Sequence, residues 1–182
     1  MSVVSSLEAD LELNTSAVKF LEIFSTRIYE LLTISPEIIQ GIEIVEGEWG
    51  TSGFVFLSHY TLLGESHLQL HSLPFTLLLH VHITVINTLK SDGTPQVAKL
   101  VVESINLVDL SMTFRVIEGD LLDVYNSFMV YLKLTPNVLS GSVLHWTIEY
   151  EKPSSDTADP ASLMETAIQV SKDVDVYVSN LI

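Results

Sequence analysis

The feature that most constrains this fold is an amphipathic stretch at residues 159–181, near the end of the chain. Its apolar residues recur at intervals of three and four positions, among them Leu163, Ala167, Val170 and Val174. This period places them along one face of an α-helix. Such a helix is roughly 30 Å long at about 1.5 Å per residue, so its apolar face needs a partner surface of similar length. The pattern therefore predicts a long helix packed across a sheet.

Asp159 and Pro160 mark the predicted start of this helix. An aspartate side chain can accept hydrogen bonds from the free N–H groups of a first helical turn. Proline suits the first helical position because the N–H that it lacks would have been unpaired there. We therefore expect Asp159 to cap the helix and Pro160 to begin it.

The chain before this helix alternates between apolar and polar residues with the two-residue period of β-strands. Strand character is found at residues 7–13, 38–45, 54–60, 95–105, 110–117, 127–134 and 144–150. Residues 15–33 instead carry two short helical patterns. Because most consecutive strands are joined by short turns, we predict an antiparallel sheet. Because helices do not alternate with strands, the class is α+β, in a single domain of residues 1–182.

Composition excludes several classes of function. The 182 residues are 47% hydrophobic, enough for one sizeable core. Eight basic and 23 acidic residues give a net charge of −15, which would repel nucleic acid. The chain has no cysteine, which excludes disulfides, a thiol nucleophile and cysteine-ligated zinc. Residues 1–13 lack the basic and apolar regions of a secretory signal, so we expect a cytoplasmic protein.

The predicted sheet turns bulky side chains toward a helix with mostly small ones. Residues of inward parity are Phe54, Phe56, Tyr60, Met112, Phe114, Phe128, Trp146 and Tyr150. The facing helix offers mainly alanine, valine, serine and methionine. Two interpretations are open. The bulky side chains fill the core, or the curved sheet leaves an apolar cavity of the kind that binds small molecules.

Five sequence motifs point to a known family. They are residues 34–37 (Ile-Ser-Pro-Glu), 44–51 (Ile-Val-Glu-Gly-Glu-Trp-Gly-Thr), 114–121 (Phe-Arg-Val-Ile-Glu-Gly-Asp-Leu), 145–152 (His-Trp-Thr-Ile-Glu-Tyr-Glu-Lys) and 159–160 (Asp-Pro). In order and spacing they resemble the major latex proteins, also called ripening-related proteins, of the plant superfamily of Bet v 1 allergens and class-ten pathogenesis-related proteins. The resemblance implies the helix-grip, START-like fold: a seven-stranded antiparallel sheet curved around a long C-terminal helix, with two short helices after strand one and a hydrophobic cavity.

The same resemblance implies a function. Family members are binders of sterols, fatty acids, flavonoids or hormone-like compounds and are linked to defence and stress responses, so a small hydrophobic ligand is the expected partner. Tyr60 and Tyr150 can also orient a ligand through their hydroxyls. No metal or other cofactor is expected. The candidate ligand-binding residues are Phe54, Phe56, Tyr60, Met112, Phe114, Phe128, Val130, Leu144, Trp146, Ile148, Tyr150, Met164, Ala167, Ile168 and Ser171.

An enzyme of specialised metabolism is the alternative, because the superfamily that this chain resembles includes norcoclaurine synthase. Such chemistry requires a lysine, tyrosine or carboxylate in the cavity with a shifted pKa. Lys133 and Glu149 have outward parity on their strands, which leaves Tyr60 and Tyr150 as inward candidates.

Other motifs favour structural roles. The glycine-rich segment 46–53 lacks the Lys-Ser/Thr ending of a nucleotide loop, and its glutamates would repel phosphate, so it predicts a hairpin tip packed by Trp49. Residues 118–120 predict a turn rather than a catalytic pair. His80 and His82 share one face of a possible strand, but no third metal ligand is evident. No serine lies in the strand–turn–helix context of a nucleophile.

Residues 64–91 have no counterpart in the family pattern. Without them, residues 58–62 would continue through an Asp-Gly turn into residues 95–99 as a tight hairpin. The apolar run 73–86 is too short for a membrane span. Two interpretations remain: an extended hairpin arm that offers an interaction surface, or an unspliced intron carried into the translated sequence.

Overall fold

A computed structural model describes residues 1–63, 93, 95–137 and 141–181. The strands are β1 (Val3–Leu13), β2 (Ile39–Glu46), β3 (Val55–Thr61), β4 (Pro95–Asn106), β5 (Ser111–Gly119), β6 (Ser127–Pro136) and β7 (Ser142–Lys152). Among these residues they form one seven-stranded sheet in the order β1-β7-β6-β5-β4-β3-β2, and every neighbouring pair is antiparallel. The predicted α+β fold with a seven-stranded antiparallel sheet is confirmed.

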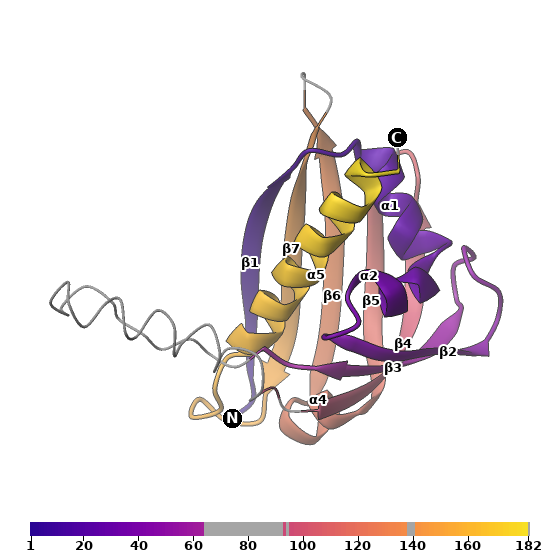
Figure 1. The fold of residues 1–182 in the computed structure, drawn as a ribbon. Helices are drawn as coiled ribbons and strands as arrows, with labels where there is room; N and C mark the ends of the chain where they lie inside the picture. The colour runs from indigo at the N-terminus through magenta and orange to yellow at the C-terminus, as the bar shows by residue number, and fades with distance from the viewer. Residues whose placement is uncertain (64–92, 94, 138–140, 182) are drawn as a thin grey trace, which may run out of the picture.

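The long helix α5 crosses the concave face of the curved sheet (Figure 1). The helical elements are α1 (Ala17–Ser25), the 3₁₀ turn η1 (Ile28–Glu30), α2 (Leu31–Ile34), α4 (Asp120–Val124) and α5 (Ala161–Ser179). Helices α1 and α2 both contact α5 and lie at its C-terminal end (Figure 1). This arrangement covers the apolar face of the sheet with the apolar faces of three helices, which is the burial that the sequence pattern requires.

Strand β7 shows how the two-residue period builds the core. Leu144, Trp146, Ile148 and Tyr150 are all buried, because each points to the concave face. Glu149, which lies between two of them, is exposed on the other face. In register, Leu144 lies opposite Leu11 of β1 and Leu134 of β6, and Trp146 opposite Ala9 and Leu132. The inward parity predicted from sequence therefore identifies the buried face of this strand.

The start of α5 differs from the prediction. Pro160 is the N-cap residue, and the Asp159 side chain makes no capping hydrogen bond. Instead, Asp159 Oδ1 accepts a hydrogen bond from the Tyr150 hydroxyl at 2.6 Å and lies 2.5 Å from Lys152 Nζ. The end of β7 brings a phenol and an ammonium group to this carboxylate, and these donors hold it away from the helix N-terminus. The prediction that Asp159 caps the helix was wrong.

Two short helical segments also differ from the sequence interpretation. The second helix, expected near residues 27–33, is a 3₁₀ turn followed by a single α-helical turn. Residues 118–120 end β5 and begin the short helix α4, which the sequence did not predict. Gly119 has a φ of 114°, and a Cβ there would lie 2.1 Å from the Val97 carbonyl oxygen. Only glycine allows the chain to turn so close to β4.

The glycine-rich segment is a hairpin tip between β2 and β3, as predicted. Gly47, Gly50 and Gly53 all have positive φ. The Trp49 ring packs edge to face on Phe54, with centroids 5.3 Å apart. The loop is thus closed by an aromatic contact, and its backbone follows a turn that side chains would strain.

The predicted insert, residues 64–91, lies outside the described residues, and so do His80 and His82. The strands on either side of it pair directly: Thr61 lies opposite Pro95, and Tyr60 opposite Gln96. The hairpin expected from the flanking sequences is therefore present in the sheet.

Candidate functional site

A cavity of about 170 Å³ lies between the concave face of the sheet and the helices. It is lined by Phe24, Ile28, Leu31, Ile39, Ile42, Phe56, Ser58, Tyr60, Ala98, Leu100, Phe114, Val116, Leu121, Val130, Trp146, Ile148, Leu163, Thr166, Ala167 and Val170. These residues come from six of the seven strands and from each of the five helical segments in the described part of the chain. None of the twenty carries a charge, and hydroxyl groups come from only three of them. The cavity is therefore suited to an uncharged, largely apolar occupant.

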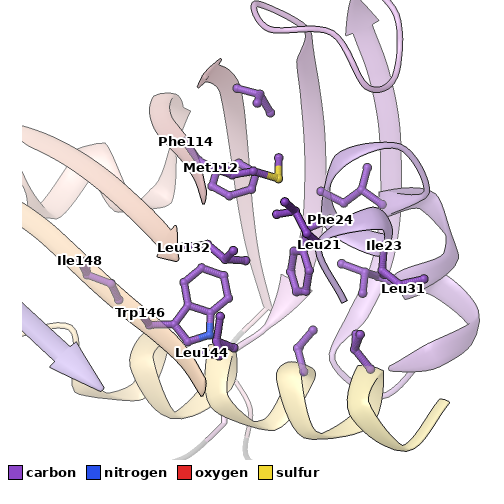
Figure 2. Packing of buried hydrophobic residues seen from close by; sticks show 14 of the residues in the cluster. Leu21, Ile23, Phe24, Leu31, Met112, Phe114, Leu132, Leu144, Trp146 and Ile148 are labelled. Carbon is purple, nitrogen blue, oxygen red and sulfur yellow. The ribbon is translucent and has the colours of Figure 1, made fainter. Parts of the chain in front are cut away.

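Bulky side chains meet across the interior of the protein. Figure 2 shows Phe114, Trp146 and Ile148 projecting from the strands toward Phe24 and Leu31 on the helices. The rings of Phe24 and Trp146 meet edge to face with centroids 5.8 Å apart. The labelled groups come from opposite sides of the interior, and all five line the cavity.

Seven of the fifteen predicted ligand-binding residues line the cavity: Phe56, Tyr60, Phe114, Val130, Trp146, Ile148 and Ala167. Six of them lie on strands with inward parity, and Ala167 lies on the sheet-facing side of α5. Parity and helical period thus placed these side chains on the correct surface of each element.

The other eight are packed into the core or beside it and do not border the cavity: Phe54, Met112, Phe128, Leu144, Tyr150, Met164, Ile168 and Ser171. Phe54 is covered by Trp49, and Phe128 stacks on Tyr150 with ring centroids 6.1 Å apart. Ser171 accepts a hydrogen bond from Trp146. Met164 and Ile168, seven and three positions earlier, lie on the same side of α5 as Ser171. Parity identifies a face of the sheet, but it does not show which part of that face remains uncovered.

Sequence reasoning missed thirteen lining residues. Ser58, Ala98, Leu100 and Val116 lie on strands, and Ser58 and Val116 share the parity of named residues, so extending the alternation would have found those two. Leu163 and Val170 belong to the predicted helical stripe. No local signal identifies the rest, Phe24, Ile28, Leu31, Ile39, Ile42, Leu121 and Thr166, because their positions depend on how the helices and the edge of the sheet pack.

Two polar groups of the cavity wall already have partners within the protein. Trp146 Nε1 donates to Ser171 Oγ at 2.9 Å, and that hydroxyl donates to the Ala167 carbonyl at 2.7 Å. Thr166 Oγ1 donates to the Ser162 carbonyl at 2.6 Å and accepts from the Leu63 N–H at 3.0 Å. These bonds join α5 to β7 and to the end of β3, so they are structural.

The two tyrosines predicted to orient a ligand differ. Tyr60 lines the cavity, is only 7% exposed, and its hydroxyl is a buried polar atom without a hydrogen-bond partner. Burial, and secondarily the Asp120 carboxylate, raise the pKa of Tyr60. The Tyr150 hydroxyl is committed to Asp159, and burial first, then that hydrogen bond, raise its pKa. Of the pair, Tyr60 is the one that lines the cavity and whose hydroxyl has no partner among the described residues.

A chain of three polar residues lies on the outer face of the sheet. His145 Nδ1 is 2.7 Å from Asp10 Oδ1, and its Nε2 is 3.0 Å from Thr135 Oγ1. The order acid, imidazole, hydroxyl is that of a hydrolytic triad. These groups are exposed and border no part of the cavity, so we assign them no chemistry.

Within the described ranges, no group of three histidine or acidic residues could hold a metal ion.

The family comparison decides the classification. A model of the pathogenesis-related protein Bet v 1 family matches residues 2–74 and 80–180. The chain belongs to this family. MLP-like protein 31 of Arabidopsis thaliana is 34% identical over 180 residues, which are 98% of this chain and 88% of that protein. MLP-like protein 28 of the same plant is also 34% identical, but the matched region spans only 44% of its length.

Solved structures of other proteins share this fold. Major latex-like protein 151 of Panax ginseng has a TM-score of 0.76 at 24% identity, with 96% of this chain and 97% of that one covered. Truncated norcoclaurine synthase of Thalictrum flavum has a TM-score of 0.62 at 16% identity over 94% of this chain and 93% of that one. At these identities the likeness shows the fold alone.

Of the helices in the described part of the chain, none has the length and apolar character to cross a membrane.

Proposed function

We propose that this protein binds small hydrophobic molecules in the cavity between its sheet and α5. The observation that carries the proposal is a cavity of about 170 Å³ whose twenty described lining residues include seventeen apolar ones and none with a charge. Burial of apolar ligand surface there contributes about 25 cal/mol per Å² before the cost of association. Membership of the Bet v 1 family and similarity to MLP-like proteins support this reading.

The first test is a titration with an environment-sensitive apolar fluorophore, competed with fatty acids, sterols, flavonoids and plant hormones. We expect saturable, competable binding that is lost in Phe114→Glu, which places a carboxylate in the wall, and in Trp146→Ala, which removes the largest wall residue. Both changes also disturb the core, so circular dichroism and thermal unfolding must accompany them.

A second pair of variants separates loss of binding from loss of folding. Ala167 borders the cavity, and Ala167→Phe would fill it from α5. Val176 is 62% exposed on the outer face of the same helix, so Val176→Phe introduces the same ring without reaching the cavity. We expect Ala167→Phe to fold and to lose fluorophore binding, and Val176→Phe to bind normally. A folded Ala167→Phe variant that binds as tightly as the natural protein would overturn the proposal.

An enzyme acting in the same cavity is the alternative function. The enzyme hypothesis requires a titratable group inside the cavity. Among the described lining residues, that group is Tyr60. Burial raises its pKa, so almost none of Tyr60 is the phenolate that could act as a base at neutral pH. A binding protein returns its ligand unchanged. Mass spectrometry of each competing ligand after prolonged incubation would detect turnover, and a converted ligand would favour the enzyme.

The proposal extends to the setting of the protein. We propose that it acts in the plant cytoplasm during defence or stress responses, as the resemblance to major latex proteins implies. Microscopy of a fluorescent fusion, combined with measurement of protein abundance after pathogen challenge, would test both parts. Secretion of the fusion, or constant abundance after challenge, would contradict them.

A further inference from the structure

The hydroxyl of Tyr60 is the unusual polar atom of this interior. Among the described residues, two buried side-chain polar atoms lack a hydrogen-bond partner: Thr15 Oγ1 and the Tyr60 hydroxyl. Thr15 lies before α1 and does not border the cavity, whereas the Tyr60 side chain forms part of the cavity wall. A buried hydroxyl without a partner destabilises a folded protein. A bound molecule with a hydrogen-bond acceptor would remove that penalty.

The charges around Tyr60 limit what this acceptor can be. Among the described residues that line the cavity, there is no lysine, arginine or histidine that could pair with an anion. Asp120 begins α4 beside this end of the cavity, and its Oδ2 accepts a hydrogen bond from the Val97 N–H at 2.6 Å. A ligand carboxylate at Tyr60 would be buried without a counter-charge and would face a second carboxylate. The geometry therefore favours a neutral acceptor.

The size of the cavity sets a second limit. About 170 Å³ is close to the roughly 150 Å³ of a protein cavity that binds benzene. It is well below the roughly 300–1,000 Å³ of pockets that enclose drug-sized molecules. A single ring with a short substituent fits this space, whereas a complete sterol or flavonoid exceeds it.

We propose that the cavity selects a neutral molecule of about one ring that carries a carbonyl or hydroxyl oxygen, and that this oxygen accepts a hydrogen bond from Tyr60. The inference rests on the proposed function and narrows it, because it excludes free fatty acids and whole sterols as fitting occupants. The raised pKa of Tyr60 keeps the phenol protonated at neutral pH, so that it remains a donor. Because the hydroxyl is buried, the ligand must displace the groups that now cover it.

Three probes of nearly equal shape test the hydrogen bond. Acetophenone has a neutral carbonyl, α-methylstyrene replaces that oxygen with a CH₂ group, and benzoate has an anionic carboxylate. Their affinities are measured by displacement of the apolar fluorophore. We expect acetophenone to bind about tenfold more tightly than α-methylstyrene, the usual size of one hydrogen bond. We expect benzoate to bind at least about 100-fold more weakly than acetophenone.

The matched variants are Tyr60→Phe, which removes only the hydroxyl, and Tyr131→Phe, which removes an exposed hydroxyl that bonds Glu149 on the outer face. Tyr60→Phe should lose the preference for acetophenone but retain binding of α-methylstyrene. Tyr131→Phe should retain both. A preference that survives in Tyr60→Phe, or benzoate that binds as tightly as acetophenone, would overturn the inference but leave the proposed function intact. If none of the three probes displaces the fluorophore, the inference fails, whereas the proposed function fails only if the fluorophore itself does not bind saturably.

Thermal unfolding distinguishes a Tyr60 hydroxyl that lacks a partner from one that already stabilises the fold. If the hydroxyl lacks a partner in the empty protein, Tyr60→Phe should raise the Tm of that protein by about 2–4 °C. The same change should reduce the further rise in Tm that saturating acetophenone gives the natural protein. A fall in the Tm of the empty variant would show that the hydroxyl is already satisfied, which overturns the inference.

Discussion

The two halves of α5 are held to the rest of the protein in different ways. The C-terminal half, from Ser171 onward, is tied down by polar contacts as well as by the apolar packing of Val174 and Val178. In the N-terminal half, Leu163, Ala167 and Val170 border the cavity. The same amphipathic stripe therefore packs closely against the core in the C-terminal half and lines the cavity in the N-terminal half.

Asp175 is the main tie of the C-terminal half. Its Oδ1 accepts from the Thr15 N–H at 2.9 Å, and its Oδ2 accepts from the Asn14 N–H and side-chain amide at 3.1 and 3.0 Å. The carboxylate thus satisfies the backbone where β1 leads into α1. A buried carboxylate is tolerated here because three donors replace its hydration.

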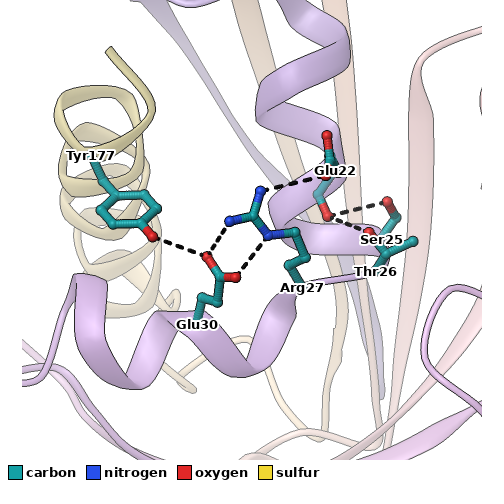
Figure 3. Close-up of polar contacts among 6 residues, drawn as sticks. All are labelled: Glu22, Ser25, Thr26, Arg27, Glu30 and Tyr177. Atoms are coloured by element: carbon teal, nitrogen blue, oxygen red, sulfur yellow. Dashed lines mark hydrogen bonds and ion pairs between the residues drawn. The ribbon is translucent and has the colours of Figure 1, made fainter. Parts of the chain in front are cut away.

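A second tie reaches the same half from the helices. Arg27 donates to Glu30 through Nε at 2.7 Å and through an Nη atom at 2.8 Å, and the Tyr177 hydroxyl donates to Glu30 at 3.3 Å (Figure 3). Asp173 also accepts a hydrogen bond from the Ser35 hydroxyl. Among the described residues, the N-terminal half has one comparable bond, from the Leu63 N–H to Thr166. The described C-terminal half of α5, which packs closely, therefore has several polar contacts, whereas the described N-terminal half, which borders the cavity, has few.

The largest expected contrast comes from one kind of substitution, Leu→Ala, made once in the sheet beneath the C-terminal half and once in the N-terminal half. Leu144 is fully buried beneath the C-terminal half, whereas Leu163 is partly exposed and already borders the cavity. Leu144→Ala should lower the free energy of unfolding by about 4 kcal/mol, and Leu163→Ala by about 1–2 kcal/mol, because Leu163 has fewer contacts to lose. Urea unfolding measures both. Equal losses would show that the two halves are packed alike.

The polar ties should give the next largest effect. Asp175→Ala leaves three donors without their acceptor and should cost about 3 kcal/mol of unfolding free energy. Thr166→Val removes the tie that the described part of the chain shows for the other half and should cost about 1 kcal/mol. The exposed Lys172→Ala on the same helix serves as the control. If Thr166→Val costs more than Asp175→Ala, the comparison is reversed.

The smallest effect concerns the junction before α5 and depends on pH. The hydrogen bond from Lys152, followed by that from Tyr150, lowers the pKa of Asp159 in the folded protein. A group whose folded pKa is depressed contributes stability above its unfolded pKa, about 4, and loses that contribution as pH falls through the folded value. Asp159→Asn should therefore reduce stability slightly at pH 7 and match the natural protein in strong acid. A difference that persists or grows in acid would contradict this assignment.

Local patterns of the sequence were good predictors of elements and faces. Alternation placed Trp146 and Ile148 on the buried face and Glu149 on the outer one, since successive residues of a strand point in opposite directions. Five turns of regular period identified α5. The five-residue helix α4 was missed because so short a segment contains too little periodicity. Asp159 was misassigned because its partners come from another strand, and a local capping rule does not include them.

The sequence by itself determined the fold class, the number of strands, the long helix and the apolar character of the interior, because all of these follow from short-range periodicity and composition. The family motifs added the expectation of a cavity. Only the tertiary structure decided which residues border that cavity, that the Tyr150 hydroxyl is taken by Asp159, and that the Tyr60 hydroxyl has no partner. These facts depend on contacts between segments far apart in the chain, where packing rather than local pattern decides what each side chain meets.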